Sequence, residues 1–414
     1  MNAIEDRRRR LLQRAAQKSA AETEKLLDTL RDREDYRSEF EYFLDLFKAP
    51  TAAALEKRSG RPALRLLCIQ APLELIHAAG FQPFRVFSGS QASALAAQGL
   101  PALVCPLLRA VLGEMVFGES SSPSLPWILP TTCDWVVKFP EMSALTGLAS
   151  PPEFYWMELP RLKSGATSRE RWIDEVWRLK GFLEKLSRRP VTRHALLASI
   201  ETYGRADDAF RKLKAARASG RLSSVWFLLV ANAFFLDAVE HWTDRVNRLE
   251  CALPAPRARP SPGARIFLAG SPLVFPNFKL PFLFEEAGLE VVADDLCSSE
   301  RLFPGETLVT DTSVFGILST LAGRYHQGCL CPIFADNERR INNILGRRLE
   351  TDFRGVVFEV LKGCHPYDLE SFSLEKGLKA QGLKFLRLET DYAPEDTRNL
   401  LTRLEAYRAT LEET

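Results

Sequence analysis

The sequence lacks the features that would assign it to several common protein classes. Its 55 basic and 53 acidic residues leave a formal charge of only +2, so no charge excess favours nucleic acid or an acidic membrane surface as partner. No secretory signal follows the basic residues at positions 7–10, and the longest apolar run, 225–236, is too short to span a bilayer. We therefore expect a cytoplasmic protein that binds neither nucleic acid nor membrane.

Two short motifs are also missing. The chain contains no Gly-x-x-x-x-Gly-Lys-Ser/Thr, so we expect no ATP bound through a P-loop, and any ATP hydrolysis must occur on a separate protein. No Cys-x-x-Cys occurs, which argues against a zinc ribbon.

The remaining composition is that of an ordinary globular protein. The chain has 414 residues, 46% hydrophobic and 26% charged, which corresponds to two to three domains at about 150 residues each. A chain of this length can bury a sizeable core.

Changes in the apolar pattern divide the chain into five parts. Helical spacing predicts an N-terminal helical segment over 1–58, with short apolar runs and helices alternating over 59–165. Helical stripes then occupy 166–250, a proline-rich linker covers 251–263, and the alternation returns over 264–414. This pattern predicts an α/β protein with two doubly wound, Rossmann-like parallel-sheet domains and a helical insertion between them. The expected strands are 64–67, 84–87, 127–129, 154–159, 265–269, 290–293, 356–361 and 385–388.

Cysteines occur at informative places on this map. Four of the eight follow predicted strands at their carboxyl ends, where ligands bind in doubly wound sheets. These are Cys68, Cys133, Cys297 and Cys364. Cys105 precedes Pro106, which predicts a sulfur at a helix N-terminus, where thiolate is favoured.

The other cysteines divide into a pair and a single residue. Cys329 and Cys331 form Cys-x-Cys, and in an extended segment both side chains point to one side. Cys251 lies in the linker and is left out. A core of ordinary buried cysteines remains an alternative, but thiolates from distant loops favour an iron–sulfur cluster over zinc.

At these positions the chain resembles the 2-hydroxyacyl-CoA dehydratase and benzoyl-CoA reductase superfamily, and within it the double-cubane cluster proteins. The resemblance covers residues from about 60 to the C-terminus. Its motifs are the segment 71–80 (APLELIHAAG), Cys105-Pro106, Thr131-Thr132-Cys133-Asp134, the segment 270–277, Asp294-Asp295-Leu296-Cys297, Cys329-Leu330-Cys331-Pro332, Gly363-Cys364-His365 and Glu389-Thr390-Asp391-Tyr392. The chain departs from the family pattern at Ser299, where glycine is common, and at 135–137.

The resemblance implies a set of cluster ligands. Cys105, Cys133 and Cys364 match the thiolates that hold a [4Fe-4S] cubane in the dehydratase subunits. Cys297, Cys329 and Cys331 match the additional cysteines of the double-cubane branch, whose [8Fe-9S] cluster has two cubanes joined by a sulfide. Cys68 is a seventh, less certain candidate. The implied cofactor is therefore [8Fe-9S], or otherwise a single [4Fe-4S] cluster.

Two further residues are candidates for catalysis. Glu74 matches an acidic residue that the family places near its cluster cavity, and an exposed glutamate in a first helical turn is the alternative interpretation. His365 adjoins Cys364 and could donate a hydrogen bond to cluster sulfur or a proton to substrate, or it could simply begin a helix.

These features lead to one expected function and two alternatives. We expect a low-potential reductase that acts on a small-molecule substrate, which could be a CoA thioester. By resemblance, its partners are a separate ATPase activator with its own [4Fe-4S] cluster and a second copy of the chain in a homodimer. The alternatives are a 2-hydroxyacyl-CoA dehydratase or acyl-CoA reductase subunit with one cubane, and an electron carrier without substrate.

Overall fold

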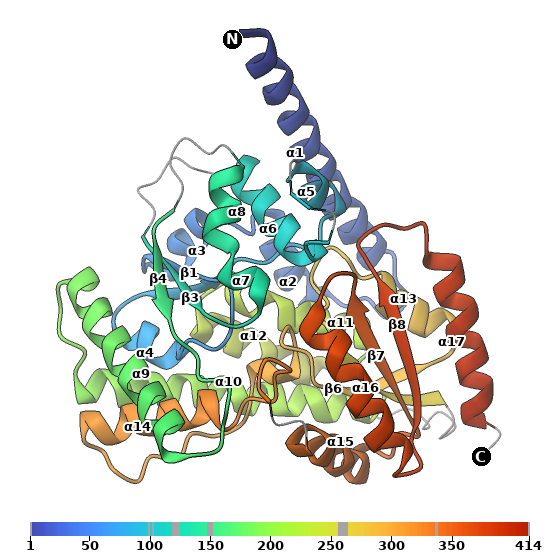
Figure 1. Ribbon diagram of the computed structural model, residues 1–414. Coiled ribbons are helices and arrows are strands. Elements are labelled where there is room, and N and C mark those ends of the chain that lie inside the picture. Colours follow the sequence, from blue (N-terminus) through green and yellow to red (C-terminus); the bar gives the residue numbers. More distant parts are fainter. Residues whose placement is uncertain are drawn as a thin grey trace.

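The computed structural model describes residues 2–97, 100–101, 103–117, 125–146, 152–255, 264–335 and 338–412, with only the backbone of residues 2–9 (Figure 1). The side chains of the arginines at 7–9 and the linker residues 256–263 therefore lie outside the described part. No helix in the described ranges is both long and apolar enough to cross a membrane.

The described strands form two parallel sheets of four strands each, which confirms the predicted fold class. The first has the order β2-β1-β3-β4, and the second has the order β6-β5-β7-β8. The first sheet comprises β1 (Ala63–Leu66), β2 (Gln82–Arg85), β3 (Trp127–Pro130) and β4 (Phe154–Met157). The second comprises β5 (Arg265–Gly270), β6 (Glu290–Asp294), β7 (Gly355–Leu361) and β8 (Lys384–Thr390).

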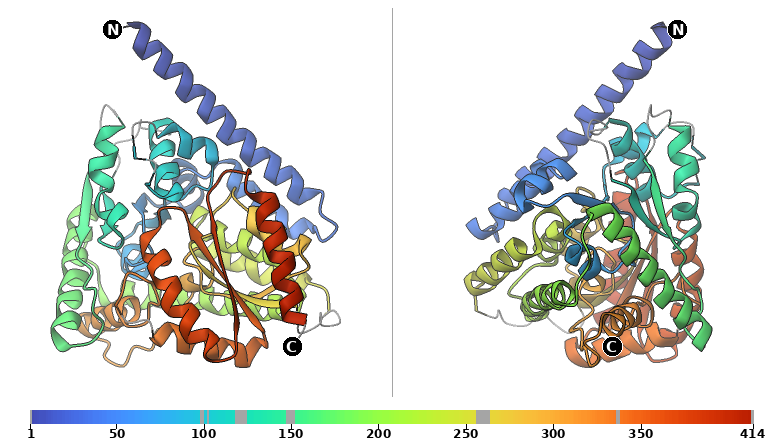
Figure 2. Two further views of the ribbon diagram at one scale, coloured as in Figure 1. Left: turned by 45° about the vertical axis from the view of Figure 1, so that its right-hand side comes forward. Right: turned by 90° about the vertical axis from the view of Figure 1, so that its left-hand side faces the viewer.

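Helices surround both sheets and connect them (Figures 1 and 2). The N-terminal helices are α1 (Asn2–Arg31), α2 (Glu41–Lys48) and α3 (Ala52–Ser59). With the first sheet are α4 (Leu73–Ala78), α5 (Gln91–Ala96), α6 (Pro106–Phe117), α7 (Asp134–Val137) and α8 (Phe139–Leu145). Between the sheets in sequence are α9 (Ala166–Ser187), α10 (Arg193–Ala218), α11 (Ser224–Asn232) and α12 (Val239–Ala252). With the second sheet are α13 (Lys279–Glu286), α14 (Val314–His326), α15 (Glu338–Thr351), α16 (His365–Lys379) and α17 (Thr397–Glu412).

The apolar run at 225–236 forms α11 and the 3-10 turn after it, and its side chains are buried except for the partly buried Asn232. The side-chain amide of Asn232 donates to the carbonyls of Leu273 and Ser298 at 3.3 Å and accepts from the Phe275 amide at 3.1 Å. The run is therefore a core helix, and its one polar residue joins it to loops of the second sheet.

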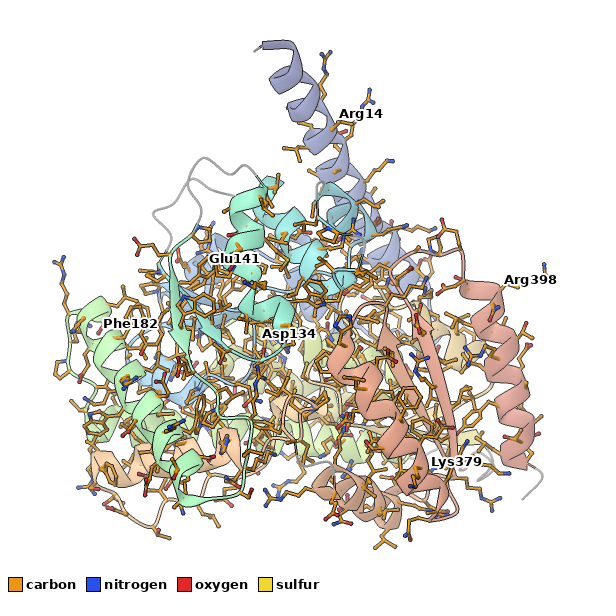
Figure 3. The ribbon with its side chains drawn as sticks, in the orientation of Figure 1. Arg14, Asp134, Glu141, Phe182, Lys379 and Arg398 are labelled. Carbon is orange, nitrogen blue, oxygen red and sulfur yellow. The ribbon has the colours of Figure 1, made fainter. Side chains whose placement is uncertain are left out.

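Helix α1 packs on the first sheet's helices only through its C-terminal part. Glu22 accepts hydrogen bonds from the Ser90 hydroxyl at 2.6 Å and the Ala92 amide at 3.0 Å. Its N-terminal half extends away from the rest of the molecule (Figure 2), and Arg14 points outward from it (Figure 3).

The strand orders determine where a ligand site can form. In each sheet the second strand in sequence lies on one side of the first, and the third and fourth lie on the other side. The direction of strand addition therefore changes between β1 and β3 and between β5 and β7. Doubly wound sheets bind ligands beyond the carboxyl ends of the strands at such a switch point.

Candidate functional site

Four of the seven predicted ligands lie at the carboxyl edges of the two sheets. Cys68 and Cys133 follow β1 and β3, the two strands that flank the first switch point, and Cys364 follows β7 at the second. Cys297 follows β6, and Cys105 directly precedes α6. The two remaining predicted ligands, Cys329 and Cys331, follow α14.

Three of these thiols, Cys105, Cys133 and Cys364, form what we term the first thiol group. Burial raises the pKa of Cys105 to about 12, and the neighbouring Cys133 contributes to the rise. Burial also raises the pKa of Cys364 well above its usual value, with further contributions from Cys105 and Cys133. The structure therefore brings thiols from both sheets together.

Backbone contacts hold these loops in place. Gly363 has φ +76°, and a Cβ atom there would lie 2.1 Å from the carbonyl oxygen of Leu103. The Trp135 indole donates to the Gly363 carbonyl at 2.8 Å. The loop before α16 is thus in direct contact both with the loop before α6 and with α7. Figure 3 shows Asp134 of α7 near the middle of the molecule.

Amides at helix starts surround the first thiol group. Cys133 and Cys364 are the N-cap residues of α7 and α16, and the Cys364 thiol also interacts with the Ser271 hydroxyl. Backbone hydrogen bonds from Leu107 and Leu108 favour the thiolate of Cys105. These donors lower the cost of negative charge on the sulfurs.

The other four thiols, Cys68, Cys297, Cys329 and Cys331, form the second thiol group. Burial raises the pKa of Cys68 to about 11; Arg85 opposes the rise, whereas Cys297 and Cys329 add to it. Burial and Cys329 raise the pKa of Cys331 well above its usual value. Cys68, the least certain prediction, is thus surrounded by other candidate ligands.

Side chains that sequence reasoning missed contact the second thiol group. The Gln70 amide donates to Cys329 Sγ at 2.6 Å, and Arg85 Nη2 donates to Cys297 Sγ at 3.2 Å. Arg85 Nη1 also donates to the Cys297 carbonyl. The sequence feature that could have pointed to Arg85 is its position, as a charged residue, inside the expected strand 84–87.

Cys133 and Cys68 connect the two groups. Burial raises the pKa of Cys133 to about 11, and Cys68 is among the contributors. Seven thiols thus form one continuous constellation. Cys251, by contrast, is exposed at the C-terminal end of α12.

Glu74 is fully buried on α4, so the exposed alternative is wrong. Tyr325 donates to Glu74 Oε2 at 2.8 Å, and Arg324 Nη1 lies 3.6 Å from Oε1. The helix start is buried because α10 packs against α4, and Ser199 of α10 donates to the Glu74 carbonyl at 2.8 Å. His365 is exposed, with its ring centroid 5.9 Å from that of Trp135.

The donor set suits a polynuclear iron–sulfur cluster. In the described part of the chain, no three Cys, His, Asp or Glu side chains are arranged to ligate a single metal ion. A cluster separates its ligands further, because several metal atoms and sulfides lie between them. Buried thiols that raise one another's pKa are stabilised as thiolates by the positive charge of bound iron.

A cavity of about 200 Å³ adjoins the second thiol group. Cys329, Gln70 and Tyr325 contribute to its walls, together with Arg301 and Arg324. A ligand in this cavity would lie beside Cys329 and next to the tyrosine that holds Glu74.

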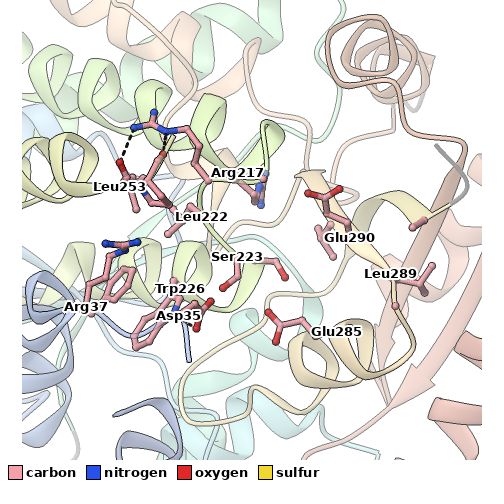
Figure 4. A pocket seen from close by; sticks show the side chains of 18 residues that line it. Asp35, Arg37, Arg217, Leu222, Ser223, Trp226, Leu253, Glu285, Leu289 and Glu290 are labelled. Atoms are coloured by element: carbon pink, nitrogen blue, oxygen red, sulfur yellow. Dashed lines mark hydrogen bonds between the residues drawn. The ribbon is translucent and has the colours of Figure 1, made fainter. Parts of the chain in front are cut away.

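A larger cavity, of about 340 Å³, lies at the opposite edge of the second sheet (Figure 4). Its walls include Ala264 and Glu290, at the starts of β5 and β6, whereas the thiols follow the carboxyl ends. Figure 4 shows Asp35, Glu285 and Glu290 around it. The cavity is therefore separate from the thiol constellation.

Comparison with known proteins identifies relatives along nearly the whole chain. The chain is 23% identical over 382 residues to the (R)-phenyllactyl-CoA dehydratase beta subunit of Clostridium sporogenes, covering 90% of this chain and 98% of the relative. It is 26% identical over 373 residues to a putative dehydratase subunit of Escherichia coli, covering 85% and 92%. It is 23% identical over 333 residues to one of the subunits of benzoyl-CoA reductase from Thauera aromatica, covering 76% and 82%.

A family model gives the assignment. The model of the 2-hydroxyglutaryl-CoA dehydratase D-component matches residues 68–411, a range that begins at Cys68 and includes all seven thiols of the constellation. The enzymatic class and the resemblance to the 2-hydroxyacyl-CoA dehydratase and benzoyl-CoA reductase superfamily are thereby confirmed. The chain belongs to the 2-hydroxyglutaryl-CoA dehydratase D-component family of enzymes.

Proposed function

We propose that this protein is a low-potential reductase whose seven-thiol constellation holds an [8Fe-9S] double-cubane cluster. The observation that carries the proposal is the proximity of the two thiol groups, joined through Cys133 and Cys68. A constellation of this size exceeds what one cubane requires, because a [4Fe-4S] cluster binds at most four thiolates.

The thiol groups supply the ligands in this proposal. Cys105, Cys133 and Cys364 hold one cubane, and Cys297, Cys329 and Cys331 hold the other. Cys68, the remaining member of the second group, interacts with Cys133 of the first and would serve as a seventh ligand. When bound, the cluster stores and passes single electrons at low potential.

Glu74 and His365 have different roles in the proposal. Glu74 is held by Tyr325, which lines the 200 Å³ cavity, so Glu74 exchanges protons with a bound substrate through the Tyr325 hydroxyl. His365 is exposed beside Trp135 and next to Cys364, where it would donate a hydrogen bond to cluster sulfur or a proton to substrate.

Of the two alternatives, one has specific support and the other is disfavoured. The names of the relatives, which include a CoA-thioester dehydratase and a benzoyl-CoA reductase, favour a subunit with a single [4Fe-4S] cluster acting on a CoA thioester. An electron carrier without substrate is disfavoured by the cavity beside Cys329.

The proposed partners are a second copy of the chain and a separate ATPase with its own [4Fe-4S] cluster. The chain has no P-loop motif of its own, so ATP-driven electron delivery requires such an activator. Rates of substrate reduction with chemical reductant alone, with activator plus ATP, and with a non-hydrolysable analogue test this part. Activator plus ATP should accelerate substrate reduction, whereas chemical reductant alone and the non-hydrolysable analogue should not. Equal rates in all three conditions would contradict the proposal.

Cysteine variants test the ligand assignment. We expect Cys331→Ser and Cys297→Ser to retain the fold and lose about half of the iron, because the other cubane keeps its own thiolates. The matched control, Cys251→Ser, changes an exposed thiol on α12 and should leave the iron content unchanged. Equal losses in all three variants would exclude the assignment.

A further inference from the structure

The two thiol groups differ in the charges around them. Backbone amides and the Ser271 hydroxyl interact with the first group, and no arginine or lysine side chain donates to its sulfurs within the described ranges. Three cationic side chains lie near the second group. Arg85 donates to the sulfur and the carbonyl of Cys297, Lys163 donates to the Cys329 carbonyl, and Arg301 lines the same cavity as Cys329.

Arg85 carries the strongest evidence. Its side chain lies on β2 and is only 6% exposed, with the guanidinium 3.5 Å from the centroid of the Phe87 ring. No described carboxylate forms an ion pair with it, and Nη2 points at Cys297 Sγ, 3.2 Å away. Because a buried charge without a counter-ion is strongly destabilising, this arginine requires an anion at the second thiol group.

Arg301 is a second cation beside this group. Its Nη2 donates to the Tyr367 hydroxyl at 2.9 Å, whereas its buried Nη1 has no hydrogen-bond partner. The nearest carboxylate, Asp295, is 3.9 Å away and is held at 2.6 Å by Arg340. Arg301 lines the same cavity as Cys329. Its charge interacts most with Tyr367 and Asp295, and less with Cys331 and Cys297.

Lys163 and Gln70 add polar contacts at Cys329. Lys163 Nζ donates to the Cys329 carbonyl and is only 6% exposed, and Gln70 donates to the sulfur at 2.6 Å. Positive charge and hydrogen bonds to sulfur both stabilise the reduced form of an iron–sulfur cluster, because reduction adds negative charge.

We propose that Arg85 and Arg301 favour the addition of the first electron to the cubane that the second thiol group would hold, so that this electron stays beside the cavity at Cys329. This inference rests on the proposed double-cubane function. The step is a one-electron transfer from dithionite or the reduced activator to the cluster. The donor is oxidised and the cluster reduced, with no bond made or broken.

Redox titration of the anaerobically purified, full-length protein, followed by electron paramagnetic resonance, tests the inference. We expect Arg85→Gln to lower the ratio of reduced to oxidised cluster in the first reduction step about tenfold at a fixed donor potential. This corresponds to a reduction potential lower by about 59 mV for a one-electron step. Arg301→Gln should shift the same step in the same direction and serves if Arg85→Gln does not fold. Arg85→Lys, which keeps the charge, should restore most of the loss.

Arg265→Gln is the matched control. Arg265 is equally buried, at 4% exposed, but begins β5 at the opposite edge of the sheet and donates to the Ala218 carbonyl at 3.0 Å. It should leave the first step unchanged. Two results would overturn this inference and leave the double cubane intact, provided that each chain holds about eight irons. One is an unchanged first reduction potential in both arginine variants, and the other is a shift confined to the second reduction step. About four irons in the wild type would instead contradict the proposed double cubane itself.

Discussion

Gly363 shows how one residue joins the two domains at the candidate site. Its positive φ suits glycine, and its missing side chain lets the Leu103 backbone approach next to Cys105 and Cys364. A single Cβ atom there would both strain the backbone and separate the loops that carry two proposed ligands.

We therefore expect Gly363→Ala to destabilise the protein by about 3 kcal/mol and to reduce its iron content. Gly382→Ala is the control, since Gly382 has a similar φ of +73° with nothing within 4 Å of the added atom. It should cost only about 1 to 2 kcal/mol and leave the iron unchanged. Anaerobic chemical denaturation and iron analysis measure both effects; equal losses in the two variants would refute this explanation.

Glu359 on β7 is a buried carboxyl group whose effect on stability depends on pH. Burial raises its pKa from 4.5 to about 8, and the charge of Lys279 opposes this only in part. Between these values the folded protein keeps the proton and the unfolded chain releases it. Wild-type stability should therefore fall with rising pH across this window and level off above it.

Glu359→Gln removes this penalty. Its stability relative to wild type should increase by up to about 1.4 kcal/mol per pH unit between pH 4.5 and 8. The control is Glu34→Gln, at an exposed position, which should show no such trend. Denaturation curves of the iron-free protein at several pH values measure the difference; a constant difference across the window would contradict the buried titration.

Helix α10 anchors the loop that carries Cys297. Its Arg217 is 1% exposed and donates to Asp294 at 2.6 Å and also to Glu300, on either side of that loop. Lys214 and Arg347 also pair with Glu300, whereas Asp294 depends on Arg217.

Replacing Arg217 with methionine should cost about 3 to 5 kcal/mol, because it leaves the buried Asp294 carboxylate without its cation. Arg211→Met on the same helix breaks only an exposed pair with Asp208 and should change stability by less than about 0.5 kcal/mol. Urea unfolding compares them. Similar values for the two variants would show that the buried network adds nothing.

The elements that sequence analysis predicted are those with strong local patterns. All eight strands were expected within a few residues, because each is a short apolar run followed by a turn. Helix α14 was missed: Gly316 and Gly323 interrupt it, and β-branched residues lower its helix propensity. Helix α16 begins at His365, where Pro366 favours the first helical turn.

The cysteines of the candidate site could be predicted from the sequence, whereas the side chains around them could not. Strand-end position identified the cysteines, because that rule depends only on local sequence and sheet topology. Arg85 lies 212 residues from Cys297, and Gln70 lies 259 residues from Cys329, so only the folded chain reveals these contacts. The burial of Glu74 also depends on α10 and α14, which are distant in sequence.

For the whole molecule, thiols that follow strands of both sheets come together in one constellation. Family membership is established by the match over residues 68–411. The domain limits, the homodimer and the separate ATPase activator stay predictions.

Iron content per chain, measured on wild-type protein purified under strict exclusion of oxygen, tests the central claim most directly. The double-cubane proposal predicts about eight irons per chain, with acid-labile sulfide in slight excess over iron. About four irons would restrict the cluster to a single cubane and favour the dehydratase alternative. A colourless protein without iron and with all eight cysteines titratable as free thiols would contradict the account.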